Sequence, residues 1–167
     1  MNDINPRLHD WLASAVEAEA SDLHVVSGYP PVLRVHGQLQ ELDKVALESE
    51  FLHQSLMQLC PPHALERFRA ERNADFALEL GEGSNPPRFR VNYFMSGQQM
   101  GACFRVIPAV IPSFEWAGFP ADLAHRLSHF RNGLVLLCGV VGSGKTTSLA
   151  MLIDLLNREG GYRIITV

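Results

Sequence analysis

The sequence predicts an α+β domain with an antiparallel sheet, followed by the truncated start of an α/β domain that carries a phosphate-binding loop. Polar and apolar residues alternate strictly over 88–94, which predicts a strand with one buried face, and residues 100–107 predict its antiparallel partner. Later in the chain, an apolar run at 134–138 leads into a glycine-rich loop and then a helical pattern. That order is typical of a P-loop unit.

The composition is that of an ordinary globular protein and argues against several classes of function. The 167 residues carry a formal net charge of −4, with 47% hydrophobic and 19% charged residues, and contain no basic run. Nucleic-acid binding is therefore not expected. No apolar run is long enough for a membrane span. The three cysteines lie far apart and no cysteine/histidine cluster has metal-ligand spacing, so neither a disulfide framework nor a zinc site is expected.

The first part of the chain predicts helices and strands of one domain over residues 1–108. Three helices are predicted where apolar residues recur at helical spacing, at 6–19, 48–59 and 63–72. Five strands are predicted from alternating or β-branched segments bounded by turn residues, at 23–26, 32–35, 74–80, 88–94 and 100–107. The first two strands form a hairpin through a tight Pro-Pro connection.

Residues 109–118 are interpreted as a linker because this stretch shows no periodicity and prolines lie in and beside it. The charge changes across it. Residues 1–118 hold 15 acidic and 9 basic side chains (−6), and residues 119–167 hold 3 acidic and 5 basic side chains (+2), which sum to −4. The second part predicts a short helix at 120–130, the P-loop unit, and a strand at 162–167. Residues 119–167 thus predict one βαβ unit.

The glycine-rich loop has the P-loop spacing Gly139-x4-Gly144-Lys145-Thr146. Its glycines let backbone N–H groups approach a phosphate, and the helix N-terminus adds partial positive charge. Lys145 is placed to reach the β- and γ-phosphates, and Thr146 to ligate Mg²⁺. The predicted nucleotide-binding residues are Gly139, Gly142, Ser143, Gly144, Lys145, Thr146 and Thr147. The alternatives are a turn that fits the spacing by chance and an unrelated P-loop kinase, although no lid or acceptor segment is visible.

Three blocks of sequence resemble the amino-terminal half of the type II/type IV secretion ATPases, in particular the PilT-like ATPases of type IV pilus retraction. The blocks are Ala-Ser-Asp-Leu-His at 20–24 with Tyr-Pro-Pro-Val-Leu-Arg-Val at 29–35, Arg-Phe-Arg-Val-Asn at 88–92 with Phe-Arg-Val-Ile-Pro at 104–108, and the P-loop block at 133–147. The resemblance implies a PAS-like domain, a linker and a RecA-like motor domain. It also implies a hexamer that uses ATP and Mg²⁺ in the cytoplasm, held by partner proteins at an inner-membrane pilus or secretion platform.

The resemblance also implies a role for three arginines, Arg88, Arg90 and Arg105, which match family positions that approach the phosphates of a bound nucleotide. Guanidinium groups suit the charge on a phosphoryl group. The alternative is three solvated arginines on the polar face of a sheet. Gln98 stands where PilT-like sequences usually carry another arginine, so a phosphate clamp is expected to be weaker here.

No Walker B acid and no catalytic base are recognisable in residues 1–167, so no complete set of catalytic residues is expected in this chain. Phosphoryl transfer needs a cradle, a metal, a base and a charge stabiliser together. We therefore expect the parent protein to be an ATPase and this chain to be inactive or nearly so. The alternative is a non-catalytic assembly or partner-docking module.

Overall fold

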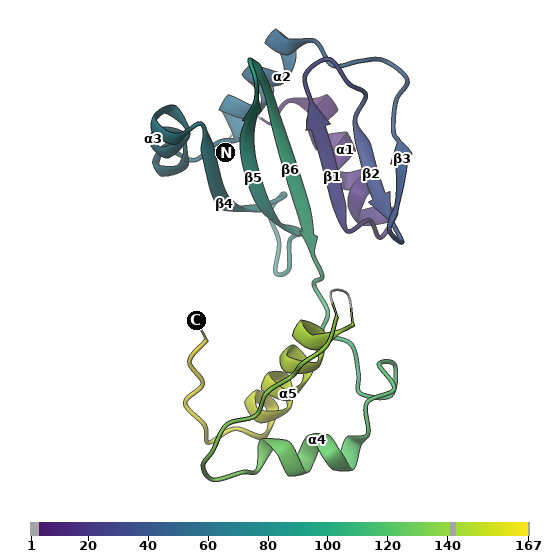
Figure 1. Cartoon of the computed structure of the whole chain (residues 1–167), viewed down its shortest axis with the longest axis vertical. Helices are drawn as coiled ribbons and strands as arrows, with labels where there is room; N and C mark the ends of the chain where they lie inside the picture. Colours follow the sequence, from purple (N-terminus) through teal and green to yellow (C-terminus); the bar gives the residue numbers. More distant parts are fainter. Residues whose placement is uncertain (1–3, 141–142, 167) are drawn as a thin grey trace. The chain divides into compact units, whose positions relative to one another are not determined.

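The computed structural model describes residues 4–140 and 143–166, and it divides the chain into two compact units, Met1–Ala109 and Val110–Val167 (Figure 1). The division falls at the start of the stretch interpreted as a linker. Among the described residues, no helix is both long and apolar enough to cross a lipid bilayer.

The first unit is built on a six-stranded antiparallel sheet with strand order β3-β2-β1-β6-β5-β4. Its strands are β1 Asp22–Val26, β2 Val32–Val35, β3 Gln38–Glu41, β4 Asn73–Glu79, β5 Arg88–Ser96 and β6 Gln99–Ile107. The five predicted strands are confirmed. β3 was not predicted, because all four of its residues are exposed and it carries no buried alternation.

Three helices, α1 Pro6–Glu17, α2 Ser49–Leu59 and α3 Pro62–Glu71, complete the first unit as predicted (Figure 1). Asn5 caps α1, because its Oδ1 accepts a hydrogen bond from the Arg7 N–H at 3.0 Å, and Pro6 occupies the first turn. The apolar side of this helix, with Leu8, Leu12 and Ala15, is buried against the sheet core. α3 likewise begins with a proline, whereas α2 has neither a side-chain cap nor a proline in its first turn and is defined by its buried apolar stripe of Leu52, Leu56 and Leu59.

The core lies on one face of the sheet and combines leucines with a cluster of aromatic side chains around Tyr93. Phe89, Val91 and Tyr93 of β5 are fully buried, whereas the alternating residues Arg88 and Arg90 are exposed. The predicted alternation is confirmed. The Tyr93 ring makes edge contacts with Phe104 and Phe76 at centroid distances of 6.4 and 5.0 Å. Its hydroxyl donates a hydrogen bond of 2.9 Å to the Leu56 carbonyl, which ties α2 to the sheet.

The described residues of the second unit form two helices, α4 Ala121–Ser128 and α5 Lys145–Glu159, which pack against each other. Ala124 of α4 and Met151 and Leu152 of α5 are its buried apolar residues within the described part of the unit. Both helices were predicted, and the helix of the P-loop unit begins at the lysine of the motif.

The prediction of strands at 134–138 and 162–167 is wrong for the residues that the structure describes. Neither 134–138 nor 162–166 forms a strand, and Val167 lies outside the described residues. Leu134 and Leu136 are 81% and 72% exposed. A β-strand satisfies its backbone groups on a neighbour, and neither segment has one among the described residues. Of the predicted βαβ unit, the described residues therefore form the helix but neither strand.

Candidate functional site

The helix α5 presents an uncapped N-terminus directly after the glycine-rich loop. Gly144 precedes the helix with a φ of 83°, in the left-handed region that glycine adopts without strain. No side chain caps this end, and the Ser148 N–H donates to the Gly144 carbonyl at 2.8 Å. The backbone N–H groups of Lys145, Thr146 and Thr147 therefore have no partner within the helix and are available to an anion.

The loop before α5 brings Ser143 and Lys145 close to Gly139. A Cβ atom on Gly139 would lie 2.6 Å from the Oγ of Ser143 and 3.9 Å from the Cδ of Lys145. The Lys145 ammonium donates a hydrogen bond of 2.7 Å to the Val140 carbonyl, so this side chain folds back over its own loop. Of the predicted nucleotide-binding residues, all except Gly142 lie within the described part of the chain, and these gather around the start of α5.

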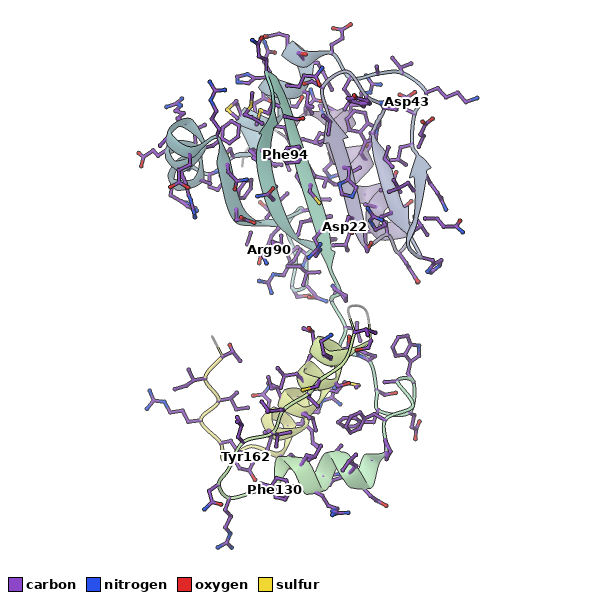
Figure 2. All side chains as sticks on the ribbon, in the orientation of Figure 1. Asp22, Asp43, Arg90, Phe94, Phe130 and Tyr162 are labelled. Carbon is purple, nitrogen blue, oxygen red and sulfur yellow. The ribbon has the colours of Figure 1, made fainter. Side chains whose placement is uncertain are left out.

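The three predicted phosphate-sensing arginines lie on the face of the sheet opposite the core. Arg88 and Arg90 alternate with buried residues on β5 (Arg90 is labelled in Figure 2). Arg105 of β6 stands directly opposite Arg90. Their side chains are 55%, 67% and 65% exposed. The sheet therefore brings the three together, as their strand positions predict, and leaves their charged ends in solvent.

Each of these arginines already has a carboxylate partner. Arg88 Nε lies 3.4 Å from a Glu79 oxygen, and Arg90 Nε lies 3.5 Å from Asp75 Oδ1. Arg105 Nε donates to Asp22 Oδ1 at 3.0 Å. In the Arg88 and Arg90 pairs both partners are exposed, and such pairs contribute little to stability, so these two guanidinium groups are free to exchange partners. The Arg105 pair differs, because its partner Asp22 is buried.

The acidic centre of this face is Asp22, which the sequence analysis missed as a site residue. It stands opposite Arg34 on β2 and Arg105 on β6, and both arginine Nε atoms lie within 3.6 Å of its carboxylate oxygens. Burial raises the pKa of Asp22, but hydrogen bonds from Ser21 and Arg105 and the charge of Arg105 outweigh it, so the pKa lies below its usual value. The available signal was the strand alternation, which puts Asp22 on the arginine face.

His24, two residues along β1, lies on the same face beside this cluster. Its Nε2 is buried and has no hydrogen-bond partner among the described residues. Burial lowers the pKa of His24, and the charges of Arg34 and Arg105 lower it further, against the opposing effect of Asp22. Its imidazole is therefore held neutral near pH 7, which suits a packed strand histidine rather than a cation.

Comparison with known proteins places the whole chain in one family. Residues 2–167 match the family described as type II/IV secretion system protein. The type IV pilus retractation ATPase PilT of Pseudomonas aeruginosa is 34% identical over 158 residues, which are 95% of this chain and 45% of that protein. The twitching motility protein of Neisseria gonorrhoeae is 31% identical over 82% of this chain and 36% of its own length. The chain thus spans less than half the length of these curated relatives.

Solved structures agree with the sequence matches. The crystal structure of the pilus retraction motor PilT with bound ADP aligns over 90% of this chain and 43% of its own, with a TM-score of 0.76 and 30% identity. The ATPase DotB of Legionella pneumophila aligns over 90% of this chain and 42% of its own, with a TM-score of 0.72 and 25% identity. These matches cover both units, and the chain belongs to the family of type II/IV secretion system proteins.

Proposed function

We propose that this chain is part of a hexameric, ATP-hydrolysing motor of type IV pilus retraction or type II secretion, and that it binds Mg-ATP through the loop at 139–147. Residues 1–108 are its PAS-like domain, 109–118 its linker and 119–167 the start of its RecA-like domain. The observation that carries the proposal is the uncapped first turn of α5, which follows the left-handed Gly144 and begins at the motif lysine.

The residues around the N-terminus of α5 fit the phosphates of a nucleoside triphosphate. Gly139 lies beside Ser143 and Lys145 of the loop, and the amides of the first turn of α5 have no helical partner. Lys145 would supply the positive charge once its ammonium leaves the Val140 carbonyl, and the Thr146 hydroxyl would hold Mg²⁺. Bound Mg²⁺ supplies charge neutralisation between the phosphates.

We propose that the chain itself binds nucleotide with little or no hydrolysis. No base and no second metal-binding acid is recognisable around the loop in the described part of the chain. A steady-state phosphate-release assay is expected to give background rates. Turnover that disappears in Lys145→Ala would contradict this.

Binding is tested by calorimetric titration of Mg-ATP into the wild-type chain and into Lys145→Ala. Loss of a charge-assisted hydrogen bond of roughly 1.5–3 kcal/mol lowers affinity about tenfold to a hundredfold. Lys44→Ala is the matched control, because Lys44 is the other lysine of the chain and is exposed in the first unit. Equal affinities for all three proteins would sink the proposal.

For Arg88, Arg90 and Arg105 we propose phosphate sensing in the assembled motor. Nucleotide phosphates would compete with Asp22, Asp75 and Glu79 for guanidinium groups that solvent already reaches. The test compares ATP-dependent oligomerisation of Arg90→Ala with that of Arg69→Ala, measured by sedimentation. Only Arg90→Ala is expected to weaken it, and equal behaviour would return the three arginines to a purely structural role.

The alternative function is a non-catalytic assembly or partner-docking module. The completed core of the first unit favours it, since that unit has its own sheet and helices and is the larger of the two. The two functions differ in nucleotide affinity. A wild-type chain that fails to bind Mg-ATP, while still associating with itself or with a platform protein, would select the docking module.

A further inference from the structure

Two histidines and a glutamate meet where α4 and α5 end. His125 lies in the last turn of α4, His129 follows four residues later on the same side, and Glu159 is the last residue of α5. The His125 Nδ1 lies 3.5 Å from one oxygen of the Glu159 carboxylate, and the His129 Nε2 lies 3.5 Å from the other. One ligand atom from each residue lies within 4.8 Å of the other two.

The protonation of His129 can be worked out from its contacts. Its Nδ1 lies 2.7 Å from the His125 backbone carbonyl, which can only accept, so this nitrogen carries the proton and donates. In the neutral imidazole the lone pair is then on Nε2, which faces a Glu159 oxygen. Two lone pairs at this distance need a cation between them or a second proton. A ring nitrogen donating to a backbone carbonyl is also the usual support of a metal-binding histidine.

The surrounding backbone adds negative potential at the same place. The C-terminal ends of both α4 and α5 lie at the cluster, and a helix C-terminus carries about half a negative charge. The basic side chain next to Glu159 is Arg158, which is already paired with Asp154 at 2.7 Å. The cluster thus combines a carboxylate, two imidazoles and two helix ends that all favour a cation.

We propose that His125, His129 and Glu159 form a binding site for a divalent transition metal of the zinc class, which would fasten α4 to α5. Two imidazole nitrogens and one carboxylate oxygen form a ligand set that suits Zn²⁺, with a fourth position left for water. Imidazole ligands disfavour Mg²⁺ and Ca²⁺. The site is separate from the phosphate loop, because it lies at the opposite end of α5 from Lys145. No zinc site was expected from the sequence, because no cysteine/histidine cluster has metal-ligand spacing, and Glu159 lies on a different helix from His125.

The test is a Zn²⁺ titration of the metal-free 167-residue chain against a chromophoric chelator. A Cys138→Ser background removes the exposed thiol of the second unit as a competing ligand. One equivalent of Zn²⁺ is expected to bind, and His125→Ala, His129→Ala and Glu159→Gln are each expected to lower its affinity at least about tenfold. His53→Ala, which removes an exposed histidine of the first unit, is expected to leave the affinity unchanged.

Two further readouts keep the result specific. All three ligand residues are exposed, so the variants are expected to keep the wild-type circular dichroism spectrum. If a histidine variant unfolds, the Zn²⁺ affinity of the conservative Glu159→Gln variant decides the test. With Co²⁺ in place of Zn²⁺, weak visible bands of nitrogen and oxygen ligands are expected to disappear in the variants. Unchanged Zn²⁺ affinity in the three ligand variants, or displacement of Zn²⁺ by equimolar Mg²⁺, would overturn the proposal.

Discussion

Strand β5 in the first unit and the segment 134–138 in the second are both rich in large apolar residues, but their environments are opposite. β5 is hydrogen-bonded to β4 and β6 along its length, and its Val91 is fully buried. The segment 134–138 has no partner strand among the described residues, and its Leu136 is 72% exposed. Strand formation in this molecule therefore depends on a neighbouring strand and a covering layer rather than on residue type alone.

Hydrogen exchange gives the largest expected difference between the two segments. The amides of β5 and β6 exchange only through unfolding of the first unit, whereas those of 134–138 have no partner strand. Protection factors in β5 are expected to exceed those in 134–138 by about a thousandfold or more, measured by NMR or mass spectrometry. Similar protection in both segments would mean that 134–138 finds a partner in solution, for example in a second copy of the chain.

A pair of truncations sharpens the same contrast in free energy. Phe104→Ala removes a fully buried ring from the core of the first unit and is expected to cost about 3–5 kcal/mol of unfolding free energy. Leu136→Ala is the matched control in the second unit and is expected to change the stability by less than about 0.5 kcal/mol. Urea denaturation measures both. A large cost for Leu136→Ala would show that this leucine is buried in solution.

Two tyrosines make a smaller comparison between the units. Tyr93→Phe removes the buried hydroxyl that donates to the Leu56 carbonyl, and is expected to cost about 1.5 kcal/mol. Burial raises the pKa of Tyr93 well above its usual value, so the hydroxyl stays protonated and the cost does not vary with pH below 10. Tyr162→Phe, at a half-exposed site of the second unit, is expected to be neutral in the same urea titration. Equal costs would contradict the assigned bond.

Acid is expected to have the smallest effect, acting on the first unit through His24 and Asp22. The pKa of each is lowered in the folded state, so each contributes stability above its unfolded pKa, and this stability is lost as the pH falls. Stability is expected to fall first below about pH 6.5 through His24, and again below about pH 4 through Asp22. Asp22→Asn is expected to cost about 1 kcal/mol at pH 7 and to remove the second decrease.

The matched control for the acid experiment is Asp154→Asn in the second unit. Asp154 pairs with Arg158 one helical turn away on the surface of α5, so its loss is expected to cost less than about 0.5 kcal/mol. Unfolding is followed by urea titration at a series of pH values. An Asp22→Asn protein that keeps both decreases would assign the second one to a different carboxyl group.

Most of the first unit could be predicted from the sequence because its signals are local. The alternation at Arg88, Phe89 and Arg90 fixes both the strand and the side on which each residue lies. The second unit could not be predicted in the same way. An apolar run at 134–138 indicates a buried strand only if the partner strands are present, and that condition is not local. The candidate sites show the same contrast between local signals, which the sequence contains, and contacts between distant segments, which it does not specify.

The glycine and lysine spacing of the phosphate loop is contiguous in sequence, and its described residues gather at the start of α5 as expected. The pairing of Asp22 with Arg34 and Arg105 depends on strand order, which a single sequence does not specify. The same holds for Glu159 beside His125 and His129, since it depends on how α4 and α5 pack. Short-range motifs were therefore readable, whereas contacts between distant segments were not.

The strand order of the first unit also sets when that unit can fold. β1–β2–β3 and β4–β5–β6 are each joined through neighbouring strands, but the two halves meet only where β1 pairs with β6. Asp22 and Arg105 in that pairing are 83 residues apart in sequence. At ordinary elongation rates the ribosome needs about 4–16 s to synthesise this stretch, so the inner edge of β1 stays unpaired for that time. During this interval the nascent chain most needs chaperones to shield the unpaired edge of β1. Slowing the ribosome between β3 and β6 would lengthen the interval.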